Sequence, residues 1–404
     1  MKLILYTATL ITALCSSSGC AIKDENTVNK SPIRFATFNV AFDRASSHVL
    51  AEQMAAGNNR QIKNVAEIIQ RTQADVLLLN EFDHDGIGRN TQVVTDFQQN
   101  FLTKSQNGAP IIHYPYFYIA PTNTGLAEHD LNGDGKISLP ADGYGFGSYH
   151  GQYGFIVLSK YPLDLSRLRS FQTFLWKDMP NAALPKKADG SSWYTEQALK
   201  HFRLSSKNHI DLPVQVSKNK TIHLLAMHPT PPVFDGLEDR NGRRNHDEIR
   251  LFADYISTEP HKSSYLIDDK GNKSSLSAED SFVIAGDLNA DPIDGDSFKQ
   301  SIIQLLHHPR INQDAAIGNK VPTSAGGQHY KTNKKYHGNA AYWTQLFPLR
   351  LDYVLPSSDL SVIDSGVYWQ AKGDPQGYLF ENSRGEQGKA VSSDHRLVWV
   401  DVTW

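Results

Sequence analysis

Cysteine is almost absent from this chain of 404 residues. The two cysteines, Cys15 and Cys20, both lie in the N-terminal segment. The rest of the chain therefore has no disulfide and no thiol chemistry, and a metal bound there must use oxygen and imidazole ligands. A Gly-rich loop that could cradle a phosphate is also missing, and no nucleophile suited to acyl transfer stands out.

The chain lacks a strong excess of charge. The formal net charge is −3, with 21% charged residues. No global basic field therefore attracts nucleic acid, which argues against strong non-specific DNA binding but allows a nuclease with a local basic groove. Hydrophobic residues make up 40% of the chain, enough for the core of a soluble globular protein of one large or two ordinary domains.

Long apolar runs are missing except near the N-terminus. Lys2 precedes the apolar stretch 3–14, which is too short to span a bilayer as a folded anchor. Ser18-Gly19-Cys20 then places small residues before a cysteine, as a bacterial lipoprotein signal does, although Ser17 stands where leucine is usual. We expect lipidation of Cys20; ordinary signal cleavage and an uncleaved anchor are the alternatives.

This N-terminus predicts a division of the chain into three parts. Residues 1–20 are a signal peptide of the lipoprotein type, residues 21–31 a polar linker, and residues 32–404 a single domain. The protein is then exported and attached to a membrane through Cys20, as an outer-membrane lipoprotein, periplasmic or extracellular.

Strand-like and helix-like segments alternate along the predicted domain. Apolar runs buried on both faces predict strands, and apolar residues at helical spacing predict helices. Such alternation favours an α/β fold with layers of helices and sheets. We expect strands at 33–40, 75–80, 154–159, 221–228, 282–287, 351–355 and 397–402, and helices at 59–72, around 249–256 and at 297–306.

Polar side chains that could bind a metal or transfer protons lie at the ends of several of these strands. Carboxylate and amide oxygens suit a hard divalent cation such as Mg²⁺, and imidazoles transfer protons near neutral pH. Together they indicate metal-assisted phosphoester hydrolysis. The residues at strand ends are Asn39, Glu81, His228, Asp287, Asn289, Asp352, Asp394 and His395.

Six short motifs in order extend this pattern over nearly the whole predicted domain. They are Thr37-Phe38-Asn39, Leu79-Asn80-Glu81, the run from Gly154 to Lys160, Gly286-Asp287-Leu288-Asn289, Arg350-Leu351-Asp352-Tyr353 and Ser393-Asp394-His395. Each motif alone is weak, but the ordered series resembles the endonuclease/exonuclease/phosphatase superfamily. That group includes deoxyribonucleases, apurinic endonucleases, neutral sphingomyelinases and inositol-polyphosphate phosphatases.

The resemblance implies a four-layer α/β/β/α sandwich, in which two packed mixed β-sheets are flanked by helices. It also implies that Glu81 is the principal ligand of a divalent cation, Mg²⁺ or Mn²⁺. Asn39 and Asp394 would lie beside the same ion.

The resemblance also implies catalytic roles. Asp287 and Asn289 would position the attacking water and the scissile phosphate, and Asp352 would orient His395. His228 matches a second imidazole of the deoxyribonuclease and sphingomyelinase branches, which protonates the leaving oxygen or binds a phosphoryl oxygen. Whether Asp287 or His395 is the formal base stays open.

These residues also have structural explanations. Asp and Asn favour turns, so Asp287 and Asn289 could simply close a turn after a strand. Asp352 could form an ion pair with Arg350. His228 precedes a proline-rich run, an unusual context that leaves room for a structural histidine.

Other candidates line the predicted site less securely. Arg243 and Arg244 follow His228 and could bind a substrate anion, since guanidinium groups suit phosphate. The acids interleaved with them equally suggest the salt-bridged start of a helix. Gln152 and Tyr153, in the loop before Gly154, are further candidates for substrate binding.

One loop resembles the opening of an EF-hand calcium loop. Asp130, Asn132, Asp134 and Lys136 take its ligand positions, and Asp142 could complete the shell because Ala141 stands where the EF-hand has Glu. We expect a structural Ca²⁺ site there or, alternatively, an Asx-rich turn.

The sequence as a whole predicts an exported, metal-dependent phosphoesterase. Its substrate would be a phosphodiester in a nucleic acid, a nucleotide or a lipid, or alternatively a phosphomonoester such as an inositol phosphate. A non-catalytic, calcium-stabilised surface binding lipoprotein is the alternative outside enzymes. The sequence identifies no protein partner.

Overall fold

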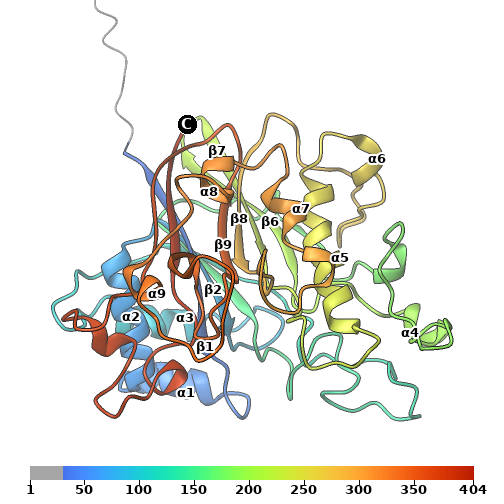
Figure 1. Ribbon diagram of the computed structural model, residues 1–404, viewed down its shortest axis with the longest axis horizontal. Helices are drawn as coiled ribbons and strands as arrows, with labels where there is room; N and C mark the ends of the chain where they lie inside the picture. Colours follow the sequence, from blue (N-terminus) through green and yellow to red (C-terminus); the bar gives the residue numbers. More distant parts are fainter. Residues whose placement is uncertain (1–30) are drawn as a thin grey trace, which may run out of the picture. The chain divides into compact units, whose positions relative to one another are not determined.

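Two β-sheets pack face to face in this computed structural model (Figure 1). The first sheet has the order β10-β11-β1-β2-β4-β3 and the second β5-β6-β7-β8-β9. The strands are β1 (Ile33–Phe42), β2 (Val76–Phe82), β3 (Tyr116–Ile119), β4 (Phe155–Ser159), β5 (Arg169–Ser170), β6 (His209–Ser217), β7 (Lys220–Met227), β8 (Ser281–Asp287), β9 (Asp352–Pro356), β10 (Ser361–Val367) and β11 (Val398–Thr403).

Helices cover the outer faces of both sheets. On the side of the first sheet lie α1 (Val49–Ala56), α2 (Arg60–Thr72) and α3 (Gln92–Phe97), and on the side of the second lie α5 (Arg240–Tyr255) and α7 (Ile303–Leu306) (Figure 1). The remaining helices are α4 (Glu196–Leu199), α6 (Pro260–Ser263), α8 (Gln313–Ala316) and α9 (Ala325–Gln328). The short 3₁₀ and π segments are η1 (Gln98–Leu102), η2 (Trp176–Asp178), η3 (Phe298–Gln300), η4 (Ala340–Tyr342), η5 (Gly377–Leu379) and η6 (Gly388–Ala390).

The structure describes residues 31–404, of which Pro32–Trp404 form one unit. The predicted signal peptide, the lipidation of Cys20 and nearly all of the predicted linker lie outside the described residues. Among the helices that are described, none combines the length and the hydropathy that a membrane crossing requires.

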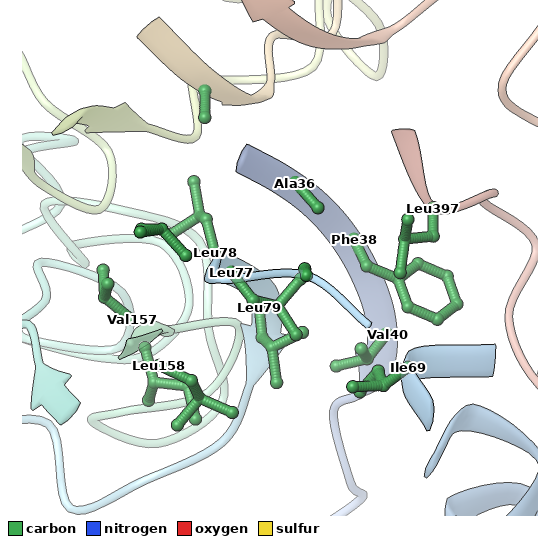
Figure 2. Close-up of a cluster of buried hydrophobic side chains, with 14 of the residues drawn as sticks. Ala36, Phe38, Val40, Ile69, Leu77, Leu78, Leu79, Val157, Leu158 and Leu397 are labelled. Atoms are coloured by element: carbon green, nitrogen blue, oxygen red, sulfur yellow. The ribbon is translucent and has the colours of Figure 1, made fainter. Parts of the chain in front are cut away.

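Helix α2 shows how local sequence builds the outer layer. The Asn59 side chain accepts a hydrogen bond from the Ile62 amide and caps the first turn. Ile62, Val65 and Ile69 recur at helical spacing and are fully buried against the first sheet. Figure 2 shows Ile69 beside the apolar side chains of β1 and β2.

The strand pairing brings four strand ends to one edge. β1 runs parallel to β2, and β7 runs parallel to β8. β1 also packs against β8 across the interface between the sheets. We call the edge at which β1, β2, β7 and β8 end the carboxyl edge. The candidate residues lie near the ends of these strands, at the start of β9 or in the adjoining loops.

The predicted four-layer fold is confirmed, and all seven of the predicted strands are present. The helix predicted at 297–306 is wrong as one element, because Lys299 and Gln300 have φ angles of 47° and 51° and interrupt it; the structure has the short η3 and, from Ile303, α7. Strand β6 was not predicted because Pro213 interrupts its apolar run. The structure accommodates Pro213 because β5 pairs only with Ile210 and Asp211 of β6.

Candidate active site

The backbone near the first two candidate residues, Asn39 and Glu81, is irregular. The pairing of β1 with β2 shifts register between Asn39 and Phe42, as a β-bulge does. Ala41 and Glu81 have φ angles of 51° and 55°, in the left-handed region that costs a residue with a Cβ atom energy. Such strain persists where surrounding structure holds it, and it is common at functional sites.

Two buried amides connect the sheets at this edge. Asn39 Nδ2 donates to Asp287 Oδ2 at 3.0 Å, and its Oδ1 accepts from the Ala41 amide. Asn80 Oδ1 accepts from the Asp287 amide at 3.3 Å and from Thr37 Oγ1. These bonds fix the end of β8 against the ends of β1 and β2, so Asp287 is held from both sheets.

Asp287 lies between two imidazoles. Its Oδ2 is 3.5 Å from His228 Nε2 and 3.7 Å from His395 Nε2, while its Oδ1 accepts from the Asn289 amide at 3.0 Å. Asn289 has a φ of 52° and donates its side-chain amide to the Pro229 carbonyl. Burial raises the pKa of Asp287 to about 6, although the neighbouring His395 opposes the rise.

His395 forms a buried pair with Asp352. His395 Nδ1 is 2.8 Å from Asp352 Oδ2, which also accepts from Thr344 Oγ1 at 2.7 Å. Burial alone would lower the pKa of His395, but the Asp352 and Asp287 carboxylates outweigh burial and raise it well above its usual value. His395 is therefore an imidazolium at neutral pH, and its Nε2–H faces Asp287.

His228 has the opposite character. Burial, together with the positive charges of Lys207 and His395, lowers the pKa of His228 well below its usual value. Its Nδ1 is buried without a hydrogen-bond partner. One imidazole of the site is therefore charged and the other neutral, a division that assigns them different tasks.

Glu81 and Asp394 form an acidic wall beside this cluster. Burial raises the pKa of Glu81 to about 7, and the Asp394 carboxylate adds to the rise. Asp43 also lies near Glu81 and forms an ion pair with Lys389. Two carboxylates that disfavour each other's charge, beside the amide of Asn39, are an oxygen donor set suited to a hard divalent cation.

A second group of donors adjoins this wall. Asp287, Asp352 and His395 place ligand atoms within 4.8 Å of one another, the only such acid and histidine group among residues 31–404. Asp352 Oδ1 is buried without a hydrogen-bond partner. As an imidazolium, His395 is not a ligand, so this group contributes the carboxylates of Asp287 and Asp352. With Glu81, Asp394 and Asn39 they provide the oxygen donors that the predicted divalent cation requires.

Cation binding is expected to depend on pH through Glu81. Because a ligand carboxylate must be deprotonated, and Glu81 has a pKa of about 7, the affinity for Mn²⁺ should rise about tenfold between pH 6 and pH 8. Titration calorimetry in buffers of different ionisation enthalpy should show about one proton released per ion at pH 6 and almost none at pH 8. An affinity that is equal at both pH values would contradict this placement of Glu81.

Lys207 was missed by the sequence analysis. It lies two residues before β6, and only 7% of its surface is exposed. Burial lowers its pKa, while the carboxylates of Glu248, Glu81 and Asp287 favour its charged form. Its ammonium group therefore interacts electrostatically with both Glu81 and Asp287. No sequence motif surrounds Lys207, so its position shortly before a strand is the one signal that could have identified it.

Replacing Lys207 with methionine should lower kcat/KM about 10- to 100-fold, because it removes a buried positive charge that interacts with Glu81 and Asp287 while keeping most of the volume. The pKa of His228 should rise as well, since Lys207 depresses it, and NMR titration measures this. Lys200→Met, at an exposed position, is the matched control. An unchanged kcat/KM with a shifted His228 pKa would limit Lys207 to an electrostatic effect on His228.

Gln152 and Tyr153 occupy different environments. Gln152 is buried, with its side chain bonded to the Ser148 amide and the Arg44 carbonyl, so the prediction that it contacts substrate is wrong. Tyr153 is half-buried and near Asp43 and Glu81, where burial raises the pKa of its hydroxyl.

Asp83 holds the loop that carries Tyr153. Its carboxylate accepts from the Tyr153 amide at 2.9 Å, the Arg44 amide at 2.7 Å and the Tyr149 hydroxyl. Burial raises the pKa of Asp83 to about 6, although these bonds oppose the rise. Asp83, which the sequence analysis also missed, thus joins the loops after β1 and before β4 behind Glu81.

The predicted arginine cluster belongs to a helix. The Arg244 guanidinium is buried and donates to the carbonyls of Leu204, Tyr144 and Arg203. Arg243 Nε donates to the Glu238 carbonyl, and its guanidinium lies over the Phe298 ring. These contacts give Arg244 a structural role in α5, which begins at Arg240. Arg243 is half-buried and only its Nε donates to the backbone, so substrate binding there stays a prediction.

The calcium-like loop is a series of Asx turns. Asp130 accepts from the amides of Gly133 and Gly135, Asn132 from that of Asp134, and Asp134 from that of Lys136. The Asp142 oxygens accept from the amides of Leu131, Asn132 and Ser138. Asp130, Asp134 and Asp142 do not form a group with ligand atoms within 4.8 Å of one another. The structure therefore favours the Asx-rich turn, the alternative to a Ca²⁺ site.

Residues 36–395 match the family model described as the Endonuclease/Exonuclease/phosphatase family. A comparison with curated proteins found no match. Among solved structures, the chain is similar to an endonuclease/exonuclease/phosphatase from Beutenbergia cavernae, at 15% identity and a TM-score of 0.47, over 92% of this chain and 72% of that one. The family match spans every predicted site residue from Asn39 to His395.

Two further structures are similar at comparable levels. An endonuclease/exonuclease/phosphatase family protein from Leptotrichia buccalis has 14% identity and a TM-score of 0.45, over 92% of this chain and 100% of that one. The beta toxin of Staphylococcus aureus has 15% identity and a TM-score of 0.42, over 91% of this chain and 99% of that one.

Proposed function

Because this chain belongs to the endonuclease/exonuclease/phosphatase family, we propose that it is a divalent-metal-dependent hydrolase of phosphodiesters. The observation that carries the proposal is the placement of Asp287 between His228 and His395, beside the acidic wall of Glu81 and Asp394. This arrangement joins a base, a fixed positive charge and an oxygen donor set in one buried cluster.

Glu81, Asp394 and Asn39 would hold the cation, Mg²⁺ or Mn²⁺. When bound there, it would neutralise charge on the phosphoryl and leaving oxygens. Asn39 also donates to Asp287, so the same side chain connects the donor set to the base. A change at Asn39 should therefore disturb both cation binding and the position of Asp287.

Water activation is assigned to Asp287. The water oxygen bonds to phosphorus while its proton passes to the Asp287 carboxylate, and the bond from phosphorus to the leaving oxygen breaks. The His395 imidazolium, oriented by Asp352, binds a phosphoryl oxygen as negative charge develops. The sequence predicted that His228 either protonates the leaving oxygen or binds a phosphoryl oxygen. Because its lowered pKa keeps it neutral, we assign it the second role, in which its N–H donates to a phosphoryl oxygen.

A phosphodiester fits the site better than a phosphomonoester. A monoester carries additional negative charge at neutral pH and is best held by additional cations. Of the arginines that the sequence offered for this task, Arg244 is buried and donates to backbone carbonyls, and Arg243 donates to the Glu238 carbonyl. The protein's own positive charges facing Asp287 are those of His395 and Lys207.

An ester panel tests the proposal. Bis(4-nitrophenyl) phosphate and 4-nitrophenyl phosphate are assayed with Mg²⁺, Mn²⁺, Ca²⁺ or a chelator. We expect the diester to be hydrolysed at least tenfold faster than the monoester, with no activity in the chelator. A preference for the monoester would reassign the substrate class, and turnover in excess chelator would end the metal-dependent proposal.

We also propose that the protein is exported and attached to a membrane through a lipidated Cys20. The motivation is the N-terminal pattern that ends in Ser18-Gly19-Cys20. Metabolic labelling with an alkyne fatty acid should mark the wild-type chain and not Cys20→Ser. Equal labelling of both chains, or of neither, would exclude an anchor at this cysteine.

A further inference from the structure

Phe146 is an exposed aromatic ring beside the active site. Its exposed fraction is 66%, which is unusual for so large an apolar side chain. Its ring lies 6.2 Å from that of Tyr153, centroid to centroid, with an interplanar angle of 38°. Tyr153 in turn adjoins Asp43 and Glu81, so Phe146 extends the site outward by one ring.

The segment that carries Phe146 is fixed by close backbone packing. A Cβ atom added to Gly145 would lie 1.8 Å from the Ser206 carbonyl oxygen, and one added to Gly147 would lie 2.8 Å from the Gly125 nitrogen. Only glycine allows such approaches on both sides of Phe146. The ring is therefore presented to solvent from a firmly packed turn.

The same packing places Phe146 on the flank where Lys207 enters the site. Gly145 contacts Ser206, the residue before Lys207. The turn that carries Phe146 thus packs against the segment that carries Lys207, while Tyr153 joins Phe146 to Glu81. This combination offers stacking to a planar ring and charge to its attached phosphate.

We infer that Phe146 and Tyr153 form a stacking subsite for the base of a nucleotide ester whose phosphate occupies the active site. The inference rests on the proposed function and names its substrate class. A planar base suits the subsite better than an acyl chain, because the tilted ring pair offers aromatic surface on which a planar ring can stack. Stacking tolerates any base, so a preference among bases is not expected.

Three esters with one leaving group test the inference. Thymidine 5′-(4-nitrophenyl phosphate), methyl 4-nitrophenyl phosphate and octyl 4-nitrophenyl phosphate all release 4-nitrophenolate, and differ only in the group that remains on phosphorus. They are assayed with wild type, Phe146→Ala and Phe146→Leu. The matched control is Phe234→Ala, at an aromatic residue 89% exposed in the loop after β7.

Phe146→Ala should lower kcat/KM for the thymidine ester about tenfold or more, and leave the methyl ester within about twofold. Phe146→Leu should show most of the same loss, because leucine keeps apolar volume but has no planar ring. Phe234→Ala should leave all three esters within about twofold. An equal loss for the octyl ester would overturn the base subsite in favour of an acyl subsite, and equal losses for all three would make Phe146 structural.

A binding measurement separates this inference from the proposed function. Thymidine 5′-monophosphate, titrated by calorimetry, should bind Phe146→Ala about tenfold more weakly than wild type. If wild type hydrolyses none of the esters but this difference in binding remains, the hydrolase proposal fails and the subsite stands. Equal binding by the two chains overturns the subsite whatever the hydrolytic activity.

Discussion

Replacing His395 with glutamine should lower kcat for bis(4-nitrophenyl) phosphate about 1,000-fold. The imidazolium faces Asp287 and is held by Asp352 at 2.8 Å, so its loss removes the fixed positive charge that meets the phosphoryl oxygens. Glutamine keeps a polar side chain of similar length without a charge. The change should act on kcat more than on KM, because the charge acts most strongly in the transition state.

His223→Gln is the matched control for this prediction. His223 Nδ1 lies 2.6 Å from Asp211 Oδ1 in a second buried pair, between β6 and β7 and away from the carboxyl edge. Both substitutions disrupt a buried His–Asp pair, and only one should affect catalysis. If His395→Gln retains most of the activity, or if His223→Gln loses as much, the catalytic role of His395 is wrong.

Glu81→Gln should abolish the stabilisation that a divalent ion gives to the protein. The wild-type chain should melt at a higher temperature in 5 mM Mn²⁺ than in chelator, because the ion binds the folded state, whereas Glu81→Gln should melt at the same temperature in both. Affinity for Mn²⁺ should fall roughly 100-fold or more. Calorimetric melting and titration measure both effects, with Glu52→Gln on the exposed face of α1 as the control.

Without a divalent ion, Glu81→Gln should be more stable than the wild-type chain. The pKa of Glu81 is raised to about 7, so its ionisation disfavours folding, and the metal-free wild-type chain should lose stability as pH rises from about 4.5 through 7. Glu81→Gln removes this loss and should therefore be the more stable metal-free chain at pH 8. A metal-free variant less stable than wild type at pH 8 would show that Glu81 serves structure rather than cation binding.

The strand ends that bear the site could be predicted because two regularities coincide there. Buried strands appear as continuous apolar runs, and Asn39, Glu81 and Asp287 stand at or near the carboxyl ends of such runs. His395 stands before one, and because β11 is antiparallel to β1 its start meets the same edge. Parallel pairing then carries distant strand ends to one edge. The sequence therefore indicated which residues meet, although not the bulge and left-handed backbone that aim them.

Residues that depend on tertiary packing could not be predicted in this way. Lys207 is placed in the site by the loop before β6, and β6 itself was not predicted because Pro213 interrupts its apolar run. Asp83 acts through amides of two loops far apart in the sequence. Arg244 resembled a phosphate ligand by composition, yet it bonds to backbone carbonyls, because a buried guanidinium must satisfy its donors wherever acceptors exist.

The fate of isotopic oxygen tests most directly whether water attacks phosphorus at this site. Bis(4-nitrophenyl) phosphate is hydrolysed in H₂¹⁸O with Mg²⁺, and the masses of both products are measured by mass spectrometry. The account predicts one ¹⁸O atom in 4-nitrophenyl phosphate and none in 4-nitrophenol. Label in the phenol, or no turnover with any divalent ion, would contradict it.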